Sequence, residues 1–380
     1  MLAAAGSTLG ASATSGPLIE HWDGAAWTPV SAPGAGQLTS VAALSPSDAW
    51  AVGTHLVGVC DQPVADHWDG SSWQAVAMPV MHRCANAGFA HAPVLAAFST
   101  TDVWAFGGRL IERWNGTRWR ILPSPKRGDI AAGAVLSPNN AWAVGSYGVS
   151  FHPKGKPCCE SERSRTLVLH WNGSAWKEVT SPNPSYANPR GARRYDDLFG
   201  LAAASPRSVW AVGDYFESRA GHHSYQTLVL HWNGKAWKRA PSPDPGGIRH
   251  DDYLYSVTVA ARNDVWAVGG YHNGHDAELP LVEHWNGHRW AVVPAPPGDP
   301  YSSEQQLTDI SADSPDDVWA AGWYLHDNNV DLVGQTLTEH WDGSSWTQVP
   351  SSNPDFEDTF DGVAATSPSD VWAVGGYYNP

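Results

Sequence analysis

His21-Trp22-Asp23-Gly24-Ala25-Ala26-Trp27 and Val371-Trp372-Ala373-Val374-Gly375 are copies of the two tryptophan motifs that organise this chain. The first motif reads His-Trp-Asp/Asn-Gly-x-x-Trp, and the second reads Val/Ala-Trp-Ala-Val-Gly. Together they recur seven times and contain 21 of the 22 tryptophans. A repeat of roughly 40–60 residues is the sequence signature of a propeller, a solenoid or an array.

Each repeat reads as four short β-strands. In the unit that spans residues 253–294, four runs of β-branched, aromatic and small residues are separated by turn residues, which is the pattern of antiparallel strands. The last two runs are joined by Asp-Gly or Asn-Gly, a strong hairpin signal because type I′ turns need positive φ at both central residues. All seven units carry this dipeptide, at residues 23–24, 69–70, 115–116, 172–173, 233–234, 286–287 and 342–343. Helical periodicity is absent from the sequence.

Seven units of four antiparallel strands predict an all-β, seven-bladed β-propeller. The chain opens on an outer hairpin, residues 18–31, and ends on an inner hairpin, residues 360–378. We expect these two halves to complete one shared blade and close the ring, which removes exposed sheet edges. A fragment of a longer open array is the alternative. The propeller is expected to span residues 18–380, and residues 1–17 to be an unstructured leader or linker.

Composition excludes several functions. The 380 residues carry a formal net charge of −15, which argues against nucleic-acid binding because phosphate contacts need a Lys/Arg surface. No apolar run approaches the ~20 residues that cross a bilayer, so we expect no membrane insertion. Only 16% of the residues are charged, while 37 glycines and 29 prolines suit many short strands and turns.

The chain has four cysteines, Cys60, Cys84, Cys158 and Cys159. Four cysteines in so long a chain do not make a disulfide scaffold. We expect a Cys60–Cys84 bridge and a vicinal Cys158–Cys159 bridge, with free thiols as the alternative.

The motifs resemble a known repeat family. Gly-Gly follows the second strand at residues 107–108, 269–270 and 375–376, and a tryptophan follows later in the repeat, as in the Kelch repeat. The form Ser-Pro-Ser-Asp-Val-Trp-Ala-Val-Gly, followed by His-Trp-Asp-Gly-Ser-Ser-Trp, is similar to Trp-rich propeller repeats of secreted or surface bacterial proteins. The resemblance covers residues 18–378 and implies the fold and a location outside the cell. It implies little about activity.

Loop length separates the two faces of the expected propeller. Turns between strands one and two, and between strands three and four, are short in every blade and share one face. The opposite face carries nearly all the long segments: 54–62, 78–92, 148–165, 181–195, 216–226, 241–252, 272–280, 295–305, 325–335 and 351–359. Because function concentrates on loops held by a rigid scaffold, we expect the site on this long-loop face.

Acidic and aromatic residues recur on that face. Carboxylates precede the inner strand in four consecutive blades, and tyrosines follow the second strand's glycine in five. We expect an acidic mouth with an aromatic rim around the axis, suited to a neutral or cationic ligand and with calcium as a candidate ion. The candidate ligand-binding residues are Trp323, Tyr324, Tyr215, Tyr271, Tyr377, Tyr147, Asp197, Asp252, Asp361 and His250. No catalytic residue and no metal ligand is assigned.

Each candidate also has a structural interpretation. Carboxylates before a strand commonly hydrogen-bond the local backbone in turns, the tyrosines are equally suited to cap the blade cores, and Trp323 to pack under a loop. Six units have a histidine before the third-strand tryptophan, with Arg113 in the seventh. A residue present in every blade is expected to be structural. The loop histidines, His250 among them, follow no metal-ligand spacing.

These observations favour a secreted, non-enzymatic recognition module that binds a glycan or a cell-surface protein through the long-loop face. A propeller enzyme, either a polysaccharide lyase or a glycosidase, is the first alternative. A structural or assembly domain of a larger extracellular protein is the second. We expect a monomer or a part of a larger assembly.

Overall fold

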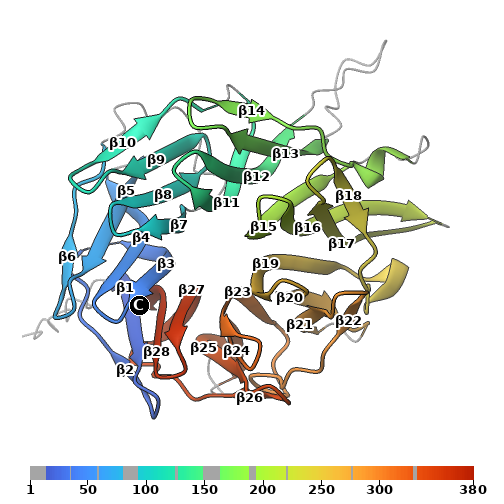
Figure 1. The fold of residues 1–380 in the computed structure, drawn as a ribbon. Helices are drawn as coiled ribbons and strands as arrows, with labels where there is room; N and C mark the ends of the chain where they lie inside the picture. Colours follow the sequence, from blue (N-terminus) through green and yellow to red (C-terminus); the bar gives the residue numbers. More distant parts are fainter. Residues whose placement is uncertain are drawn as a thin grey trace, which may run out of the picture.

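In the computed structural model the chain forms a closed ring of seven four-stranded antiparallel sheets around a central axis (Figure 1). The structure describes residues 14–34, 36–57, 60–79, 93–124, 127–148, 163–187, 194–219, 221–274, 277–327 and 332–380. The predicted seven-bladed propeller is confirmed. Among the described residues no helix is long and apolar enough to span a membrane.

The blades are numbered in chain order, each from its inner to its outer strand. Blade 1 comprises β3 (Gln37–Ser45), β4 (Asp48–Val57), β5 (Cys60–Trp68) and β6 (Trp73–Ala75). Blade 2 comprises β7 (Val94–Ser99), β8 (Asp102–Gly107), β9 (Leu110–Trp114) and β10 (Trp119–Leu122). Blade 3 comprises β11 (Asp129–Ser137), β12 (Asn140–Gly148), β13 (Ser164–Trp171) and β14 (Trp176–Glu178). Blade 4 comprises β15 (Asp196–Ser205), β16 (Ser208–Arg219), β17 (His222–Trp232) and β18 (Trp237–Ala240).

Blade 5 comprises β19 (Asp252–Ala261), β20 (Asp264–His272), β21 (Glu278–Trp285) and β22 (Trp290–Val292). Blade 6 comprises β23 (Gln305–Ser314), β24 (Asp317–Asp327), β25 (Leu332–Trp341) and β26 (Trp346–Gln348). Blade 7 comprises β27 (Glu357–Ser367), β28 (Asp370–Asn379), β1 (Thr14–Trp22) and β2 (Trp27–Pro29). Two short 3₁₀ helices, η1 (Pro184–Ala187) and η2 (Gly247–Arg249), lie in the loops before blades 4 and 5.

Blade 7 closes the ring from both ends of the chain. Strand β1 pairs with β28 from Thr14 opposite Asn379 to Trp22 opposite Val371. This is the predicted sharing of one blade, although β1 begins at Thr14 and so extends into the segment that was expected to be unstructured. The pairing leaves neither β1 nor β28 as an open edge, since each has a partner on both sides.

Tryptophans join each blade to the next. The second-strand tryptophan of a blade inserts between two tryptophans of the following blade: the ring of Trp50 lies 5.0 Å from Trp114 and 5.6 Å from Trp119, nearly perpendicular to the latter. The same arrangement crosses the closure, where Trp319 lies 5.2 Å from Trp22 and 5.5 Å from Trp27. All seven second-strand tryptophans are buried: Trp50, Trp104, Trp142, Trp210, Trp266, Trp319 and Trp372. The repeat tryptophans therefore form the core between blades rather than a site.

The glycine that ends the second tryptophan motif is required by the inner strand. Six of the seven inner strands carry a register shift near their start, as between Leu307 and Asp309 of β23. There the neighbouring strand approaches so closely that a Cβ on Gly322 would lie 2.0 Å from the carbonyl oxygen of Gln306. Only glycine fits this contact. The bulge turns one extra side chain per inner strand toward the axis.

The outer hairpins differ from the predicted turn type. Trp22 pairs with Trp27, so the loop between the two strands has four residues rather than the two of a type I′ turn. Asp23 accepts hydrogen bonds from the amides of Ala25 and Ala26 at 2.9 and 3.0 Å, and Gly24 has a φ of 94°. The Asp/Asn side chain stabilises the loop through these bonds, which explains why Asp-Gly and Asn-Gly predict the hairpin correctly but not its geometry.

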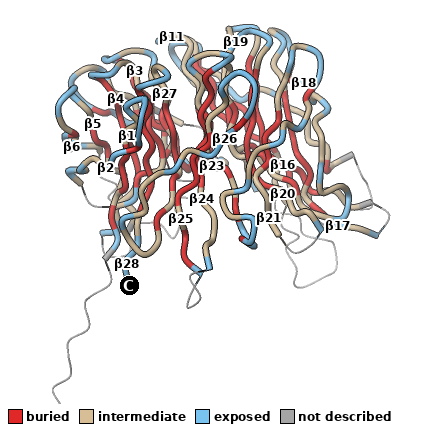
Figure 2. Tube along the Cα trace, turned by 90° about the horizontal axis from the view of Figure 1, so that it is seen from below, coloured by how far each residue is buried: buried red, intermediate tan, exposed pale blue. Residues whose placement is uncertain are grey.

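The ring has two unlike faces. Buried residues occupy the middle of the ring's height, and exposed residues gather at the two faces (Figure 2). The inner strands begin, and the second strands end, on the long-loop face. The start of β1 at Thr14 and the end of β28 at Asn379 lie on this face as well, because the two residues are paired.

Deletion of residues 1–31 tests the closure. The variant loses β1 and β2 and with them the partly buried Trp22 and the buried Trp27. A fully buried tryptophan contributes roughly 4–6 kcal/mol gross. We expect its thermal transition, followed by circular dichroism, to shift far below that of the parent or to lose cooperativity.

A circular permutant supplies the control. Residues 14–31 placed after Pro380 through a short glycine linker restore β1 beside β28, because Thr14 and Asn379 are paired. This permutant should melt close to the parent. A deletion variant that melts like the parent would show that the ring does not depend on the shared blade.

Candidate functional site

The predicted tyrosines lie in the interfaces between blades. Tyr215 is 6% exposed and packs in the core between blades 3 and 4, where the guanidinium of Arg239 lies 4.3 Å from its ring. Tyr147, Tyr271 and Tyr324 pack in the same way against the cores that precede blades 3, 5 and 6. Tyr377 lies against Gly16 of β1, where an added Cβ would be 2.7 Å from its hydroxyl oxygen. These positions favour the packing role over a shared rim.

The predicted carboxylates divide into two kinds. Asp252 is fully buried and accepts a hydrogen bond from the Gly246 amide at 2.8 Å, which fixes the loop before blade 5. Asp358 accepts the Asp355 amide at 3.0 Å and Gln305 accepts the Gly298 amide at 2.8 Å, so this position holds the preceding loop in several blades. By contrast, Asp361 lines a cavity on the axis, and Asp197 belongs to the cluster described below.

Two further candidates, Trp323 and His250, come from different blades. Trp323 is half-buried on β24, paired with Gln306 on one side and Thr336 on the other. His250 follows η2, and its carbonyl oxygen accepts a hydrogen bond from the Gln226 side chain at 3.3 Å. The structure therefore does not gather the ten predicted residues into one site.

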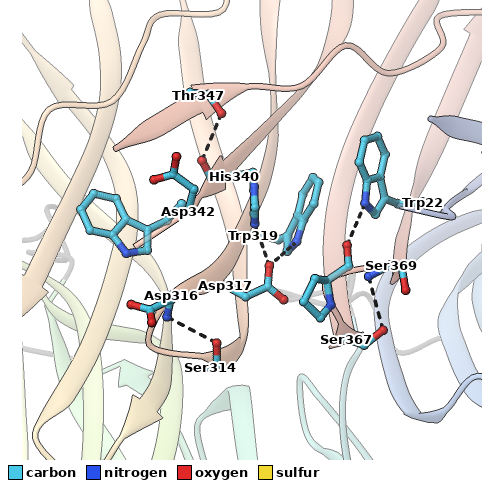
Figure 3. A network of polar contacts seen from close by, with 12 residues as sticks. Trp22, Ser314, Asp316, Asp317, Trp319, His340, Asp342, Thr347, Ser367 and Ser369 are labelled. Carbon is cyan, nitrogen blue, oxygen red and sulfur yellow. Dashed lines mark hydrogen bonds and ion pairs between the residues drawn. The ribbon is translucent and has the colours of Figure 1, made fainter. Parts of the chain in front are cut away.

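The repeated histidines hold each blade together, as the structural interpretation predicts. The Nε2 of His340 lies 2.7 Å from Oδ1 of Asp317, which also accepts the indole N–H of Trp319 (Figure 3). The imidazole of His340 stacks on the ring of Trp319 at 4.4 Å. Equivalent pairs recur in the other blades: His21–Asp370, His67–Asp48, His170–Asn140, His231–Ser208, His284–Asp264 and Arg113–Asp102. The first residue of the second strand thus receives this side chain in every blade.

Blades 4 and 5 depart from the repeat. Six aromatic side chains form a continuous chain of ring contacts from the loops toward the axis; we call Tyr195, Phe199, Phe216, Tyr225, Tyr253 and Tyr255 the aromatic cluster. Tyr225 lies 5.4 Å from Phe216 and 5.6 Å from Tyr253, and Tyr253 stacks on Tyr255 at 6.0 Å with an angle of 9°. Tyr255 in turn lies 6.2 Å from Phe199. Except for the buried Phe216, these rings are partly exposed.

Four carboxylates surround the aromatic cluster. Asp197 and Asp214 lie directly opposite each other on β15 and β16. Asp251 accepts the amide of Tyr225 at 2.8 Å and also hydrogen-bonds the hydroxyl of Tyr253. Burial, followed by the charges of Asp214 and its neighbours, raises the pKa of Tyr225 to about 12. Glu278 is the fourth, and after burial its charge is the main influence that raises the pKa of Tyr255.

The loop before blade 5 is fixed against β17. Gln226 donates from its side chain to the carbonyl oxygens of Gly247 and His250 at 3.1 and 3.3 Å. Ser224 donates to the carbonyl of Ile248 at 3.0 Å. These bonds place Asp251 beside Tyr225, so the aromatic cluster is held by a scaffold that is rigid on both sides.

A cavity of about 220 Å³ lies on the axis, and all seven inner strands contribute to its wall. Asp309 accepts the Ser256 hydroxyl at 2.6 Å and the Val363 amide at 2.9 Å, and so links the inner strands of blades 5, 6 and 7. Asp361 projects from the bulge of β27 into the same wall. Burial raises the pKa of Asp309 to about 6, and burial together with the charge of Asp309 raises the pKa of Asp361 to about 7. Phe199 and Tyr255 join this cavity to the aromatic cluster.

Asp309, Asp214 and all six residues of the aromatic cluster are absent from the residues predicted from the sequence. The signal was present in the inner strands. At the bulge, other blades place Thr39, Ala131 or Thr308, whereas blades 4 and 5 place Phe199 and Tyr255. Large aromatic side chains beside a crowded axis break the pattern of small residues, and they mark the sector that differs.

Five blades also bury a carboxyl group in the third strand, just before the repeated histidine or, in blade 2, just before Arg113. These residues are Glu20, Asp66, Glu112, Glu283 and Glu339, each at most 3% exposed. Both carboxyl oxygens of Glu339 make no hydrogen bond with any described residue. Burial raises the pKa of Glu339 to about 8. Burial also raises the pKa of Glu20 to about 7, although hydrogen bonds from Ser352 act to lower it. Blades 3 and 4 have Leu169 and Leu230 at this position.

The cofactor and disulfide predictions gain no support. Within the described ranges, no group of three or more His, Cys, Asp or Glu side chains is arranged to hold a metal ion. Cys84, Cys158 and Cys159 lie outside the described residues, and only the backbone of Cys60 is described, at the start of β5. Calcium at the acidic mouth and both disulfide bridges therefore stay predictions.

Comparison with known proteins shows no family for this chain. No protein-family model matches the chain, and no curated protein matches it. Among solved structures, Sqt1 of Chaetomium thermophilum is 12% identical with a TM-score of 0.49, covering 90% of this chain and 95% of its own. A glycoside hydrolase is 9% identical with a TM-score of 0.38, covering 86% and 94%. The extracellular domain of the hybrid two-component system BT3049 from B. thetaiotaomicron is 10% identical with a TM-score of 0.48, covering 89% and 39%. The Kelch-like resemblance remains a prediction.

The buried carboxyls make stability depend on pH. Their folded pKa lies above the unfolded value of 4.5 for glutamate, so the native state binds more protons between the two values. Their contribution to stability is complete below the unfolded pKa and is lost as the pH rises through about 7 for Glu20 and about 8 for Glu339. We expect the melting temperature to fall by roughly 2–5 °C or more between about pH 6 and about pH 9.

Glu339→Leu tests this account with the residue that blades 3 and 4 carry at the same position. Scanning calorimetry across this pH range should give a shallower decline and a higher melting temperature at alkaline pH than the parent. Glu304→Leu, at an exposed residue, is the control. An unchanged pH slope in Glu339→Leu would contradict the buried-carboxyl account.

Proposed function

We propose that this protein is an extracellular recognition module that binds a glycan through the aromatic cluster of blades 4 and 5, on the long-loop face. The observation that carries the proposal is the chain of partly exposed rings from Tyr225 through Tyr253 to Tyr255, bordered by carboxylates. Aromatic faces stack on the apolar faces of sugar rings, and carboxylates accept hydrogen bonds from hydroxyl groups. The protein acts outside the cell in this proposal.

The position of the cluster supports recognition. Ligand sites usually combine a large apolar surface with a few well-placed polar groups on a rigid framework. Here the rings come from two neighbouring blades, and the loop between them is fixed by the side chain of Gln226. The formal net charge of −15 disfavours anionic ligands because like charges repel. A neutral or cationic glycan fits best.

Tyr225→Ala and Tyr253→Ala test the proposal. Each substitution removes one ring from the middle of the cluster, and truncation of a central aromatic typically weakens binding by roughly tenfold or more. A glycan array should first identify a bound sugar, and isothermal titration calorimetry should then show the loss in both variants.

Tyr301→Ala is the matched control, because Tyr301 is a tyrosine of the same long-loop face that is 94% exposed. It should bind like the parent. Binding that survives both cluster substitutions, or that is found only to a cell-surface protein, would count against the proposal.

A propeller glycosidase is the second candidate, and the axial cavity favours it. Burial raises the pKa values of Asp309 and Asp361 to about 6 and about 7, and the charge of Asp309 adds to the rise at Asp361. Near neutral pH one carboxyl of such a pair donates a proton while the other stays charged. An enzyme of this kind would cleave oligosaccharides and lose cleavage in Asp361→Asn. Glycan binding without cleavage by the parent would exclude it.

A further inference from the structure

Asp214 of blade 4 is a buried carboxyl surrounded by other carboxyls. Its side chain is 4% exposed, and its Oδ1 makes no hydrogen bond with any described residue. Burial and the charges of Asp197, Asp196 and Asp251 all raise its pKa well above the usual range. These three neighbouring carboxylates have the same sign as an ionised Asp214.

Ionisation of Asp214 in these surroundings is costly unless a cation lies beside it. A buried carboxyl without a partner loses its hydration, and neighbouring negative charges add to the cost of ionisation. The repeat does not require an acid here, because the same position after the glycine is Ser146 in blade 3, Gly270 in blade 5 and Trp323 in blade 6. The position is therefore free to be specialised in blade 4.

The rings on the same face of blade 4 indicate which cation this is. Asp214 is two residues from Phe216 on β16, and Phe216 pairs with Tyr225, so strand alternation places all three on one face. Tyr225 in turn contacts Tyr195, Phe216 and Tyr253. Aromatic faces next to buried carboxylates are the surroundings that bind organic ammonium groups, through cation–π attraction and charge-assisted hydrogen bonds. No set of three or more ligating side chains for a metal ion occurs in the described part of the chain.

We infer that this site takes a primary ammonium group of the ligand, with Asp214 as its charge partner and Tyr225 and Tyr253 as the ring faces beside it. The inference rests on the proposed glycan recognition and narrows it to a glycan with free amino groups. Asp197 and Asp251 add negative charge and keep the ammonium protonated. A neutral sugar finds the same rings but gives an ionised Asp214 no charge partner.

A matched pair of sugars tests this inference. A β-1,4-linked glucosamine oligomer and its fully N-acetylated counterpart differ at one nitrogen of each ring, which is an ammonium in the first and a neutral acetamide in the second. Isothermal titration calorimetry at neutral pH should show tighter binding of the free amine by roughly tenfold or more. Asp214→Asn keeps the size of the side chain and removes its charge, so it should abolish this difference while the acetylated oligomer binds as before. Asp313→Asn, at an exposed aspartate, should keep the difference.

Proton release gives a second readout. Because the pKa of Asp214 is raised well above its usual range and a bound ammonium favours the carboxylate, binding should release up to about one proton, measured by titration in buffers of different ionisation enthalpy. Should Asp214→Asn fail to fold, this measurement on the parent still decides the question, and Asp251→Asn should weaken amine binding.

The outcomes separate the two proposals. Equal binding of both oligomers, without proton release, overturns the ammonium inference and leaves glycan recognition intact. If neither oligomer binds and a lysine-containing peptide binds in an Asp214-dependent way, the amine belongs to a peptide and the inferred amino glycan is wrong. Binding of no sugar on an array overturns the proposed function itself.

Discussion

The rest of the structure depends on the insertion of one tryptophan of each blade between two tryptophans of the next. Because the pattern is cyclic, it works only if the last blade meets the first, and the contacts of Trp319 with Trp22 and of Trp372 with Trp68 at 4.9 Å complete it. A histidine stacks on six of these second-strand tryptophans and Arg113 lies over the seventh, Trp104. The first residue of the second strand holds each of these side chains against the indole. The repeated tryptophans therefore hold neighbouring blades together and close the ring.

A ring closed in this way is free to vary where the repeat imposes no packing partner. The bulge of each inner strand is one such place, because it turns a side chain toward the axis without affecting the contacts between blades. Blade 7 places Asp361 there, and blades 4 and 5 place Phe199 and Tyr255. The residue after the second-strand glycine is another, and Asp214 occupies it in blade 4. Both kinds of variable position meet in one sector, next to a long loop that Gln226 holds in place.

The fold could be predicted because each tryptophan and each Asp-Gly or Asn-Gly pair has the same local role in every blade. The closure followed from which strands stand at the two ends of the chain. The site could not be predicted in the same way. Tyr215 and Tyr271 look equivalent to functional aromatics in sequence, but alternation along the strand directs them into the interface between blades. The burial of Asp214 and its position opposite Asp197 depend on strand register, which the pattern of residues does not reveal.

The repeated residues build the scaffold, and the proposed ligand site lies where blades 4 and 5 depart from the repeat. A crystal structure with an amine-bearing oligosaccharide bound would show whether the ligand lies there. We expect a sugar ring against Tyr225 and Tyr253, with its ammonium nitrogen within hydrogen-bonding distance of a carboxyl oxygen of Asp214. A sugar bound beside Trp323, or on the opposite face of the ring, would rule out this site.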